Sequence, residues 1–404
     1  MQTVIRNVRP WGKGPSDVVL DEGRIAAVRS HDPGVTVDGE VVDGRGRLLL
    51  PSFSDVHVHL DSTRLGLPFR PHTGSPGIWN MVMNDRRNWR DAEWPVDRRA
   101  DHTLALMIAR GTTRVRSYAQ IDVDCGLTRF EAVLKARENH AARCDVQVIA
   151  FPQAGLLRED GTVPLIEEAL RSGADVVGGI DPCELDRDPV RHLDIVFGLA
   201  ERYQVPVDIH LHEPGDLAVW TTGLIAERTR ACGMQGKVSI SHGYALGGVS
   251  EATTARVIDD LAASDIAMAT VAPSVDTSLP LAQLTAAGVR LGLGEDGQRD
   301  YWSPYGNADM LDRVWQLAFT NRFRADELIE HCAAVGTVGG ASILGDATAR
   351  LQSAADRPGL EVGDPADLVV LAGETVAAAV MDRLEDRTVI HAGSVVADAF
   401  ELVG

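Results

Sequence analysis

The chain has 404 residues, of which 45% are hydrophobic and 24% are charged, a balance typical of globular proteins and not of disordered ones. The formal net charge of −19 disfavours nucleic acid and anionic membrane surfaces as partners, because both carry the same sign. We find no apolar run long enough to span a membrane and no basic and apolar leader at the start, so we expect a cytoplasmic protein.

Short β-branched runs alternate with helical segments along most of the chain. After the first run they recur about every 30 residues, the length of one βα unit. Helical segments with apolar residues on one face precede Gly111 and Gly173, which are expected helix C-caps. The pattern predicts a (β/α)8 barrel of parallel strands, with an open doubly wound sheet as the alternative. The predicted strands cover residues 54–59, 112–117, 146–151, 174–180, 205–210, 237–242, 266–270 and 289–294.

Two terminal segments and one long crossover depart from this repeat. Residues 1–50 and 355–404 contain short strand patterns, and each segment is too small to bury a core alone, so we predict that they form one small β domain beside the barrel. The crossover at residues 62–111 contains Trp79, Trp89 and Trp94. We predict that residues 62–100 form a lid over the active face, and the alternative is packing of these tryptophans on the barrel exterior.

Polar residues at the ends of the predicted strands indicate a metal site. His57 and His59 are two residues apart on one strand, so both imidazoles can face the same cation. His210 and His242 end the fifth and sixth predicted strands, and Asp296 follows the eighth. Because strand ends converge at one mouth of a (β/α)8 barrel, these groups predict a bound divalent metal. The five cysteines form no C-x-x-C pair, which excludes the small zinc deaminase fold.

Several segments resemble the amidohydrolase superfamily, and within it the cytosine deaminase-like branch. The resemblance implies a catalytic barrel over residues 51–354 and a small β-sandwich domain formed by residues 1–50 and 355–404. It also implies one divalent metal ion, zinc or iron, bound by His57, His59, His210 and Asp296. No lysine lies at the end of the fourth predicted strand, which disfavours a binuclear site bridged by a carboxylated lysine. The segments cover residues 51–63, 149–155, 168–178, 208–213, 241–242 and 294–311.

The resemblance also implies a hydrolytic deaminase, in which metal-activated hydroxide attacks an amidine-like ring carbon and ammonia leaves. Asp296 would accept the proton of the attacking water, Glu213 would protonate the ring nitrogen, and His242 would stabilise the tetrahedral intermediate. For substrate binding, Gln153 would form hydrogen bonds with a ring carbonyl and a ring N–H. Trp302 is either part of the pocket wall or a core residue.

Three residues of this chain differ from the pattern of the cytosine deaminase-like branch, and these differences affect the expected substrate more than the expected reaction. Gly297 stands where cytosine deaminases commonly carry a second aspartate, Glu295 replaces a histidine, and His212 replaces an acidic residue. Cytosine is therefore disfavoured, and the partner is expected to be another small heterocycle. Gly297 could make room for an N-alkyl group, so the alternative is an amine-releasing hydrolase of a triazine, similar to N-isopropylammelide hydrolases. A noncatalytic barrel scaffold is the third hypothesis, and a homo-oligomer is expected.

Overall fold

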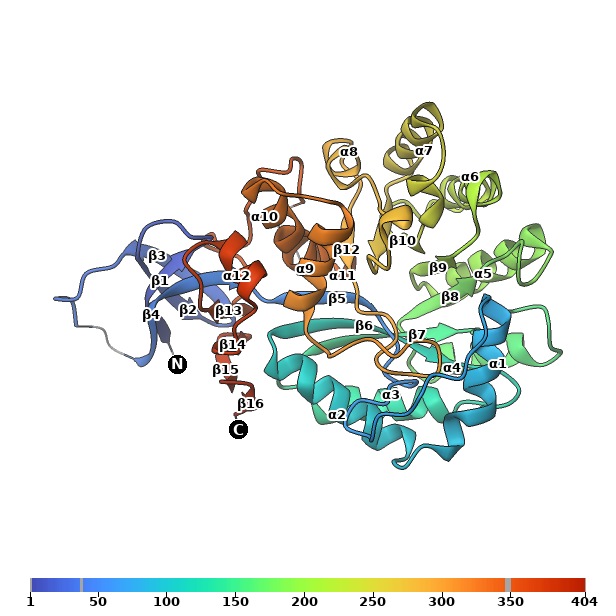
Figure 1. Ribbon diagram of the computed structural model, residues 1–404, viewed down its shortest axis with the longest axis horizontal. Helices are drawn as coiled ribbons and strands as arrows, with labels where there is room; N and C mark the ends of the chain where they lie inside the picture. The colour runs from blue at the N-terminus through green and yellow to red at the C-terminus, as the bar shows by residue number, and fades with distance from the viewer. Residues whose placement is uncertain (1, 37–38, 346–349, 404) are drawn as a thin grey trace.

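The computed structural model describes residues 2–36, 39–345 and 350–403 and contains a closed barrel and a separate sheet (Figure 1). Residues 1, 37–38, 346–349 and 404, which belong to the predicted domain ranges, lie outside the described residues. The barrel confirms the predicted closed architecture and excludes the open sheet. No helix within the described ranges has the length and apolar character needed to cross a bilayer.

The barrel has eight parallel strands, and each predicted run overlaps one of them. Contact between Leu293 and Asp55 pairs the last strand with the first and closes the ring. The runs were recognisable because strands buried on both faces are nearly continuous in β-branched and apolar residues. The strands are β5 (Phe53–Val58), β6 (Thr112–Gln120), β7 (Asp145–Phe151), β8 (Val176–Ile180), β9 (Val207–Leu211), β10 (Val238–His242), β11 (Ile266–Thr270) and β12 (Leu291–Leu293).

Amphipathic helices surround the barrel. α4 buries Ile166, Ala169 and Leu170 on one face, and the chain then turns through Gly173 at a φ of 104°. The helices are α1 (Ile78–Asn88), α2 (Val96–Ala109), α3 (Thr128–Asn139), α4 (Thr162–Arg171), α5 (Pro189–Tyr203), α6 (Gly215–Ala231), α7 (Glu251–Ala263), α8 (Leu281–Ala286), α9 (Met310–Thr320), α10 (Asp326–Ala334), α11 (Gly340–Leu344) and α12 (Val376–Asp382). Shorter helical turns are η1 (Trp89–Asp91), η2 (Tyr244–Gly247), η3 (Val275–Thr277) and η4 (Val335–Gly339).

The second sheet is built from both ends of the chain. Its order is β16-β15-β14-β13-β4-β1-β2-β3, and antiparallel pairing of β13 with β4 joins the C-terminal strands to the N-terminal ones. Figure 1 shows this sheet to one side of the barrel. Its description as a β-sandwich and the domain boundaries stay predictions. The strands are β1 (Thr3–Pro10), β2 (Ser16–Asp21), β3 (Arg24–Ser30), β4 (Glu40–Pro51), β13 (Leu368–Leu371), β14 (Arg387–His391), β15 (Ser394–Asp398) and β16 (Glu401–Leu402).

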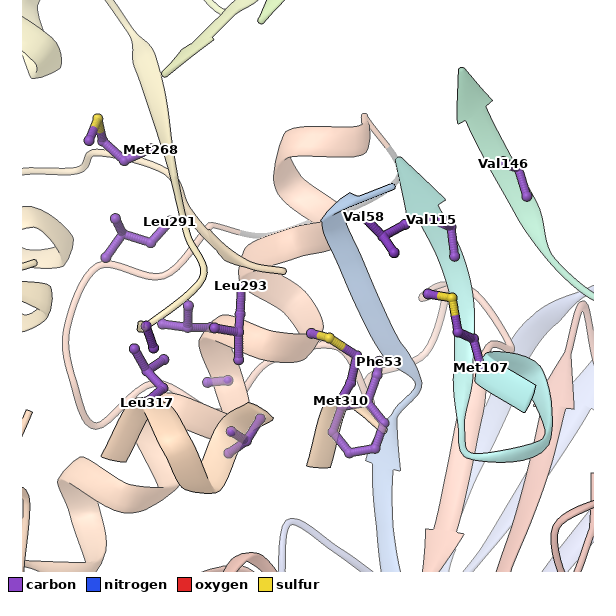
Figure 2. Packing of buried hydrophobic residues seen from close by; sticks show 14 of the residues in the cluster. Phe53, Val58, Met107, Val115, Val146, Met268, Leu291, Leu293, Met310 and Leu317 are labelled. Atoms are coloured by element: carbon purple, nitrogen blue, oxygen red, sulfur yellow. The ribbon is translucent and has the colours of Figure 1, made fainter. Parts of the chain in front are cut away.

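One continuous apolar cluster joins the barrel, its helices and the second sheet. Figure 2 shows part of it, with Phe53 and Leu293 from the barrel and Met310 and Leu317 from α9. A separate apolar cluster around Tyr118 and Phe151 is formed by residues of β6, β7 and β8 and by Leu185 after β8. Burial of this kind fixes the strand ends in place, and the polar groups described next project from them.

The long crossover after β5 contains α1, η1 and α2. Arg86 on α1 forms ion pairs with Asp122 at 3.0 Å and Glu159 at 2.8 Å, which tie α1 to the loops that follow β6 and β7. Trp89 is buried and lies under the Arg129 guanidinium, whereas Trp79 packs against the cluster around Tyr118. The tryptophans therefore have different roles, and substrate coverage by residues 62–100 stays a prediction.

Candidate active site

Backbone pairing brings the strand-end residues of β5 and β12 together. The Asp296 N–H donates to the His57 carbonyl at 2.7 Å, and the His59 N–H donates to the Asp296 carbonyl at 3.4 Å. Asp296 reaches this position with a φ of 60°. Because the two histidines alternate with Val58, both side chains face the same mouth as Asp296.

Three imidazoles and one carboxylate converge there. The Asp296 Oδ1 atom lies 3.5 Å from the His57 Nε2 and 3.5 Å from the His59 Nε2. His210, at the end of β9, places its Nε2 at 3.4 Å from the His59 Nε2. The structure therefore brings together the four residues predicted as metal ligands.

The electrostatics of this four-residue cluster suit a cation. Burial lowers the pKa of His59 to about 3 and that of His210 well below its ordinary value, so both rings are neutral and keep a lone pair. Burial alone would raise the pKa of Asp296, but the adjacent His57 and the other imidazoles hold it well below its usual range. Both His57 ring nitrogens are buried without a hydrogen-bond partner among the described residues. These donors fit one divalent cation such as zinc or iron.

His242 lies at the edge of the cluster. Its ring centroid is 4.6 Å from that of His57, and its Nε2 is buried without a described partner. The Nδ1 is 2.8 Å from the Tyr244 hydroxyl, which fixes the ring orientation. Tyr244 was missed from the sequence, because no motif singles out a tyrosine two residues after a strand-end histidine.

A second residue pair at this mouth was also missed. The His212 Nδ1 lies 2.8 Å from Asp181 Oδ2, its backbone N–H donates to Asp181 Oδ1 at 2.7 Å, and its ring centroid is 4.1 Å from that of His242. Burial lowers the pKa of His212, but the charge and hydrogen bond of Asp181, together with the charges of Asp296 and Glu184, raise it above its ordinary value. The available signal was the His210-x-His212 spacing, the same alternation that identified His57 and His59.

Glu213 is fully buried at a short distance along the chain from His210. Its Oε1 accepts the N–H groups of Cys183 at 2.6 Å and Glu184 at 3.1 Å, and its Oε2 accepts the Thr221 hydroxyl at 2.5 Å. Burial raises the pKa of Glu213 despite these donors, which favours the protonated form that a general acid needs. None of its described hydrogen bonds joins it to the four-residue cluster.

The predicted substrate-binding residues lie at different distances from the cluster. The Trp302 ring meets the His59 ring edge-on at 4.7 Å, so Trp302 borders the site. Gln153 follows Phe151, whose ring centroid is 4.3 Å from that of His210, and the Gln153 Oε1 is buried without a described partner.

Gly297 does not leave the free room that the sequence suggested. A Cβ built there would overlap the Asp300 Oδ2 and lie 2.8 Å from the Asp300 Cγ. Burial raises the pKa of this Asp300 carboxyl to about 7. The Asp300 carboxylate therefore occupies the space that a side chain at position 297 would fill. A cavity of about 340 Å³ lies beside it, between the crossover and the segment after β12, and is lined by Asn84, Asp300 and Tyr301 among others.

The chain is similar to several known proteins in sequence and in fold. The chain is 32% identical over 302 residues to the uncharacterized protein YahJ of Escherichia coli, covering 74% of this chain and 65% of that protein. The structure superposes with a TM-score of 0.89 on N-isopropylammelide isopropylaminohydrolase from Burkholderia multivorans, at 34% identity and with 100% of both chains covered. It superposes with a TM-score of 0.80 on 5-methylcytosine deaminase from Klebsiella pneumoniae, at 26% identity over 98% of this chain and 97% of that one.

The predicted superfamily and the enzyme prediction are confirmed, and the noncatalytic scaffold is disfavoured. The family described as amidohydrolases matches residues 96–397, which is most of the barrel and part of the second sheet. The chain therefore belongs to the amidohydrolase family and is a hydrolytic enzyme that acts on C–N bonds.

Proposed function

We propose that this chain is a metal-dependent aminohydrolase that removes an exocyclic amino group from a small N-heterocycle and releases ammonia. The observation that supports it most is that ligand atoms of His57, His59 and Asp296 lie within 4.8 Å of one another at the mouth of the barrel, with the His210 Nε2 3.4 Å from the His59 Nε2. Cytoplasmic location and assembly into a homo-oligomer stay predictions.

His57, His59, His210 and Asp296 would hold the cation. When bound, a divalent cation acts as a Lewis acid and makes a water-derived nucleophile available near neutral pH. The pKa of the Asp296 carboxyl lies well below its usual range, so the group is ionised, and as a carboxylate it would accept the proton of the attacking water.

The residues around the proposed metal ligands would carry out the remaining proton transfer and bind the substrate. Glu213, whose pKa is raised, would donate its proton to the ring nitrogen as electrons move onto it. The unpartnered His242 Nε2 would contact the oxygen of the tetrahedral intermediate, with its other nitrogen held by Tyr244. Gln153 would present its free amide oxygen to a ring N–H, and Trp302 would form one wall.

A second candidate is release of an alkylamine instead of ammonia. The Burkholderia multivorans enzyme, which by its name acts on N-isopropylammelide, gives the higher TM-score of the two structural comparisons, 0.89 against 0.80. The cavity of about 340 Å³ beside Asp300 offers space for a substituent on the departing nitrogen.

One experiment separates the two candidates. Zinc-loaded and iron-loaded protein is incubated with a panel of aminopyrimidines, aminotriazines, pterins and their N-alkyl derivatives, and products are identified by mass spectrometry with Asp296→Ala as the blank. Ammonia from the unsubstituted compounds supports the first candidate, and alkylamine from the N-alkyl series supports the second. No metal-dependent turnover of any compound would contradict both.

A further inference from the structure

Among the described residues, no side chain or carbonyl forms a hydrogen bond with the Nδ1 atom of any of the three imidazoles of the proposed metal site. A metal-binding histidine normally donates its second ring N–H to a carboxylate, a carbonyl or water, which fixes its tautomer and orientation. Here the Nδ1 atoms of His57, His59 and His210 are buried without a hydrogen-bond partner among the described residues. Among the described residues, the contact that all three rings share is with an aromatic side chain.

Tyr118 on β6 makes that contact with all three rings. Its ring centroid lies 4.4 Å from that of His57, 5.0 Å from that of His59 and 4.3 Å from that of His210. It stacks on His59 with an interplanar angle of 23° and meets His210 edge-on at 87°, both favourable aromatic geometries. Tyr118 is fully buried, so solvent does not compete with these ring contacts.

The hydroxyl of Tyr118 is itself fixed by a buried polar network. It donates to the Asp208 Oδ1 at 2.8 Å and lies 2.7 Å from the Ser241 Oγ. The other carboxylate oxygen of Asp208 accepts from Arg116 at 3.2 Å and from Ser239 at 2.5 Å. Groups from β6, β9 and β10 thus fix the position and orientation of the Tyr118 ring. Both carboxylate oxygens of Asp208 accept hydrogen bonds in this network.

We propose that Tyr118 is a positioning residue that holds the three metal-binding imidazoles in place by ring contact, in the role that hydrogen-bond acceptors usually have. This inference rests on the proposed metal site and extends it to a residue that touches no substrate. The ring of Tyr118 should have the main effect on metal affinity. Its hydroxyl should have a smaller effect, because it acts only by holding the ring in place.

The test measures metal binding, not turnover. Wild type, Tyr118→Leu and Tyr118→Phe are compared by zinc competition with a chromogenic chelator, by the visible spectrum of the cobalt-substituted protein, and by thermal unfolding without metal. Tyr203→Phe is the matched control, because the Tyr203 hydroxyl contacts Glu167 on the outer helices. We expect Tyr118→Leu to weaken zinc binding about 10- to 100-fold and to alter the cobalt bands. Tyr118→Phe should weaken it about 2- to 10-fold, and the control should not change it.

The outcomes separate this inference from the proposed function. Stoichiometric zinc in the wild type together with unchanged zinc affinity in Tyr118→Leu would overturn the role of Tyr118 and leave the metal site standing, even if the melting temperature falls. A wild type that binds neither zinc, iron nor cobalt would overturn both. If Tyr118→Leu does not fold, an affinity of Tyr118→Phe equal to that of the Tyr203→Phe control overturns the proposal.

Discussion

Substitution of Gly297 by alanine should destabilise the protein through a single displaced carboxylate. The new Cβ would overlap the Asp300 Oδ2 and lie 2.8 Å from the Asp300 Cγ, so the carboxylate must leave its position. It now accepts the N–H groups of Trp302 at 2.8 Å and Ser303 at 3.0 Å and the Ser62 hydroxyl at 3.1 Å. With about 0.5–1.5 kcal/mol for each hydrogen bond, losing all three costs about 1.5–4.5 kcal/mol.

A double-mutant cycle isolates this effect. Urea unfolding is measured for wild type, Gly297→Ala, Asp300→Ala and the double variant. We expect Gly297→Ala to lower the free energy of unfolding by about 1.5–3 kcal/mol in the wild type, within the range for overpacking, and by less than about 0.5 kcal/mol when Asp300 is already alanine. Gly198→Ala on α5 is the matched control: nothing lies within 4 Å of its added Cβ, and helix propensity should stabilise it by up to about 1 kcal/mol.

The cycle can also refute the reasoning. Equal losses from Gly297→Ala in both backgrounds would show that Asp300 does not fill the space beside Gly297. A second readout comes from the loop that Asp300 fixes. Because Trp302 borders the site and its N–H is held by Asp300, Gly297→Ala should raise KM more than it lowers kcat.

Three further substitutions test the proposed proton donor, the group that orients His242 and the stability of the fold. Glu213→Gln removes the proposed proton donor and should lower kcat about 10²- to 10⁴-fold with zinc content unchanged, whereas Glu184→Gln, which alters an exposed neighbour, should not. Tyr244→Phe frees the His242 Nδ1 and should lower kcat about 2- to 10-fold without changing zinc affinity; a parallel loss of zinc would contradict that assignment. Burial raises the pKa of Asp122, but hydrogen bonds from backbone and side-chain donors lower it below 3.8. Asp122→Asn should therefore lower the free energy of unfolding by about 1–3 kcal/mol at pH 5–7. This difference from the wild type should shrink as the pH falls below about 3.8, because the wild-type carboxylate then becomes protonated. A difference that is constant down to pH 2.5 in urea titrations would refute this.

The barrel and the group of strand-end polar residues were predictable because both follow from short-range patterns. Parallel strands buried on both faces give apolar runs at regular spacing, and the barrel carries their carboxyl ends to one mouth. Strand alternation places His57 and His59 on one face, His210 ends a predicted run and Asp296 follows one, whereas the choice of these four as ligands came from the resemblance to the amidohydrolase superfamily. Strand alternation and strand-end position place the backbone of these four residues at one mouth of the barrel, whereas the orientation of their side chains depends on contacts that the pattern does not show.

The residues that support the cluster could not be found in the same way. Tyr118 faces Asp208 and Ser241 across the barrel, and nothing in the local sequence around 118 shows which residues lie opposite. The pairing of Asp181 with His212 joins two loops, so it depends on the course of both. Alternation identifies a face of a strand, but it does not identify the partner that the face meets.

Gly297 shows why loop residues are harder to interpret than strand ends. A missing side chain next to a metal ligand suggested added space, and the inference would hold if the loop were otherwise unchanged. The loop instead folds back so that Asp300, whose Oδ1 caps two backbone N–H groups, places its carboxylate against the Cα of Gly297. Glycine is required there because the neighbouring carboxylate fills the space of its side chain. The open space in this region is the cavity lined by Asp300, and not the position of the Gly297 side chain.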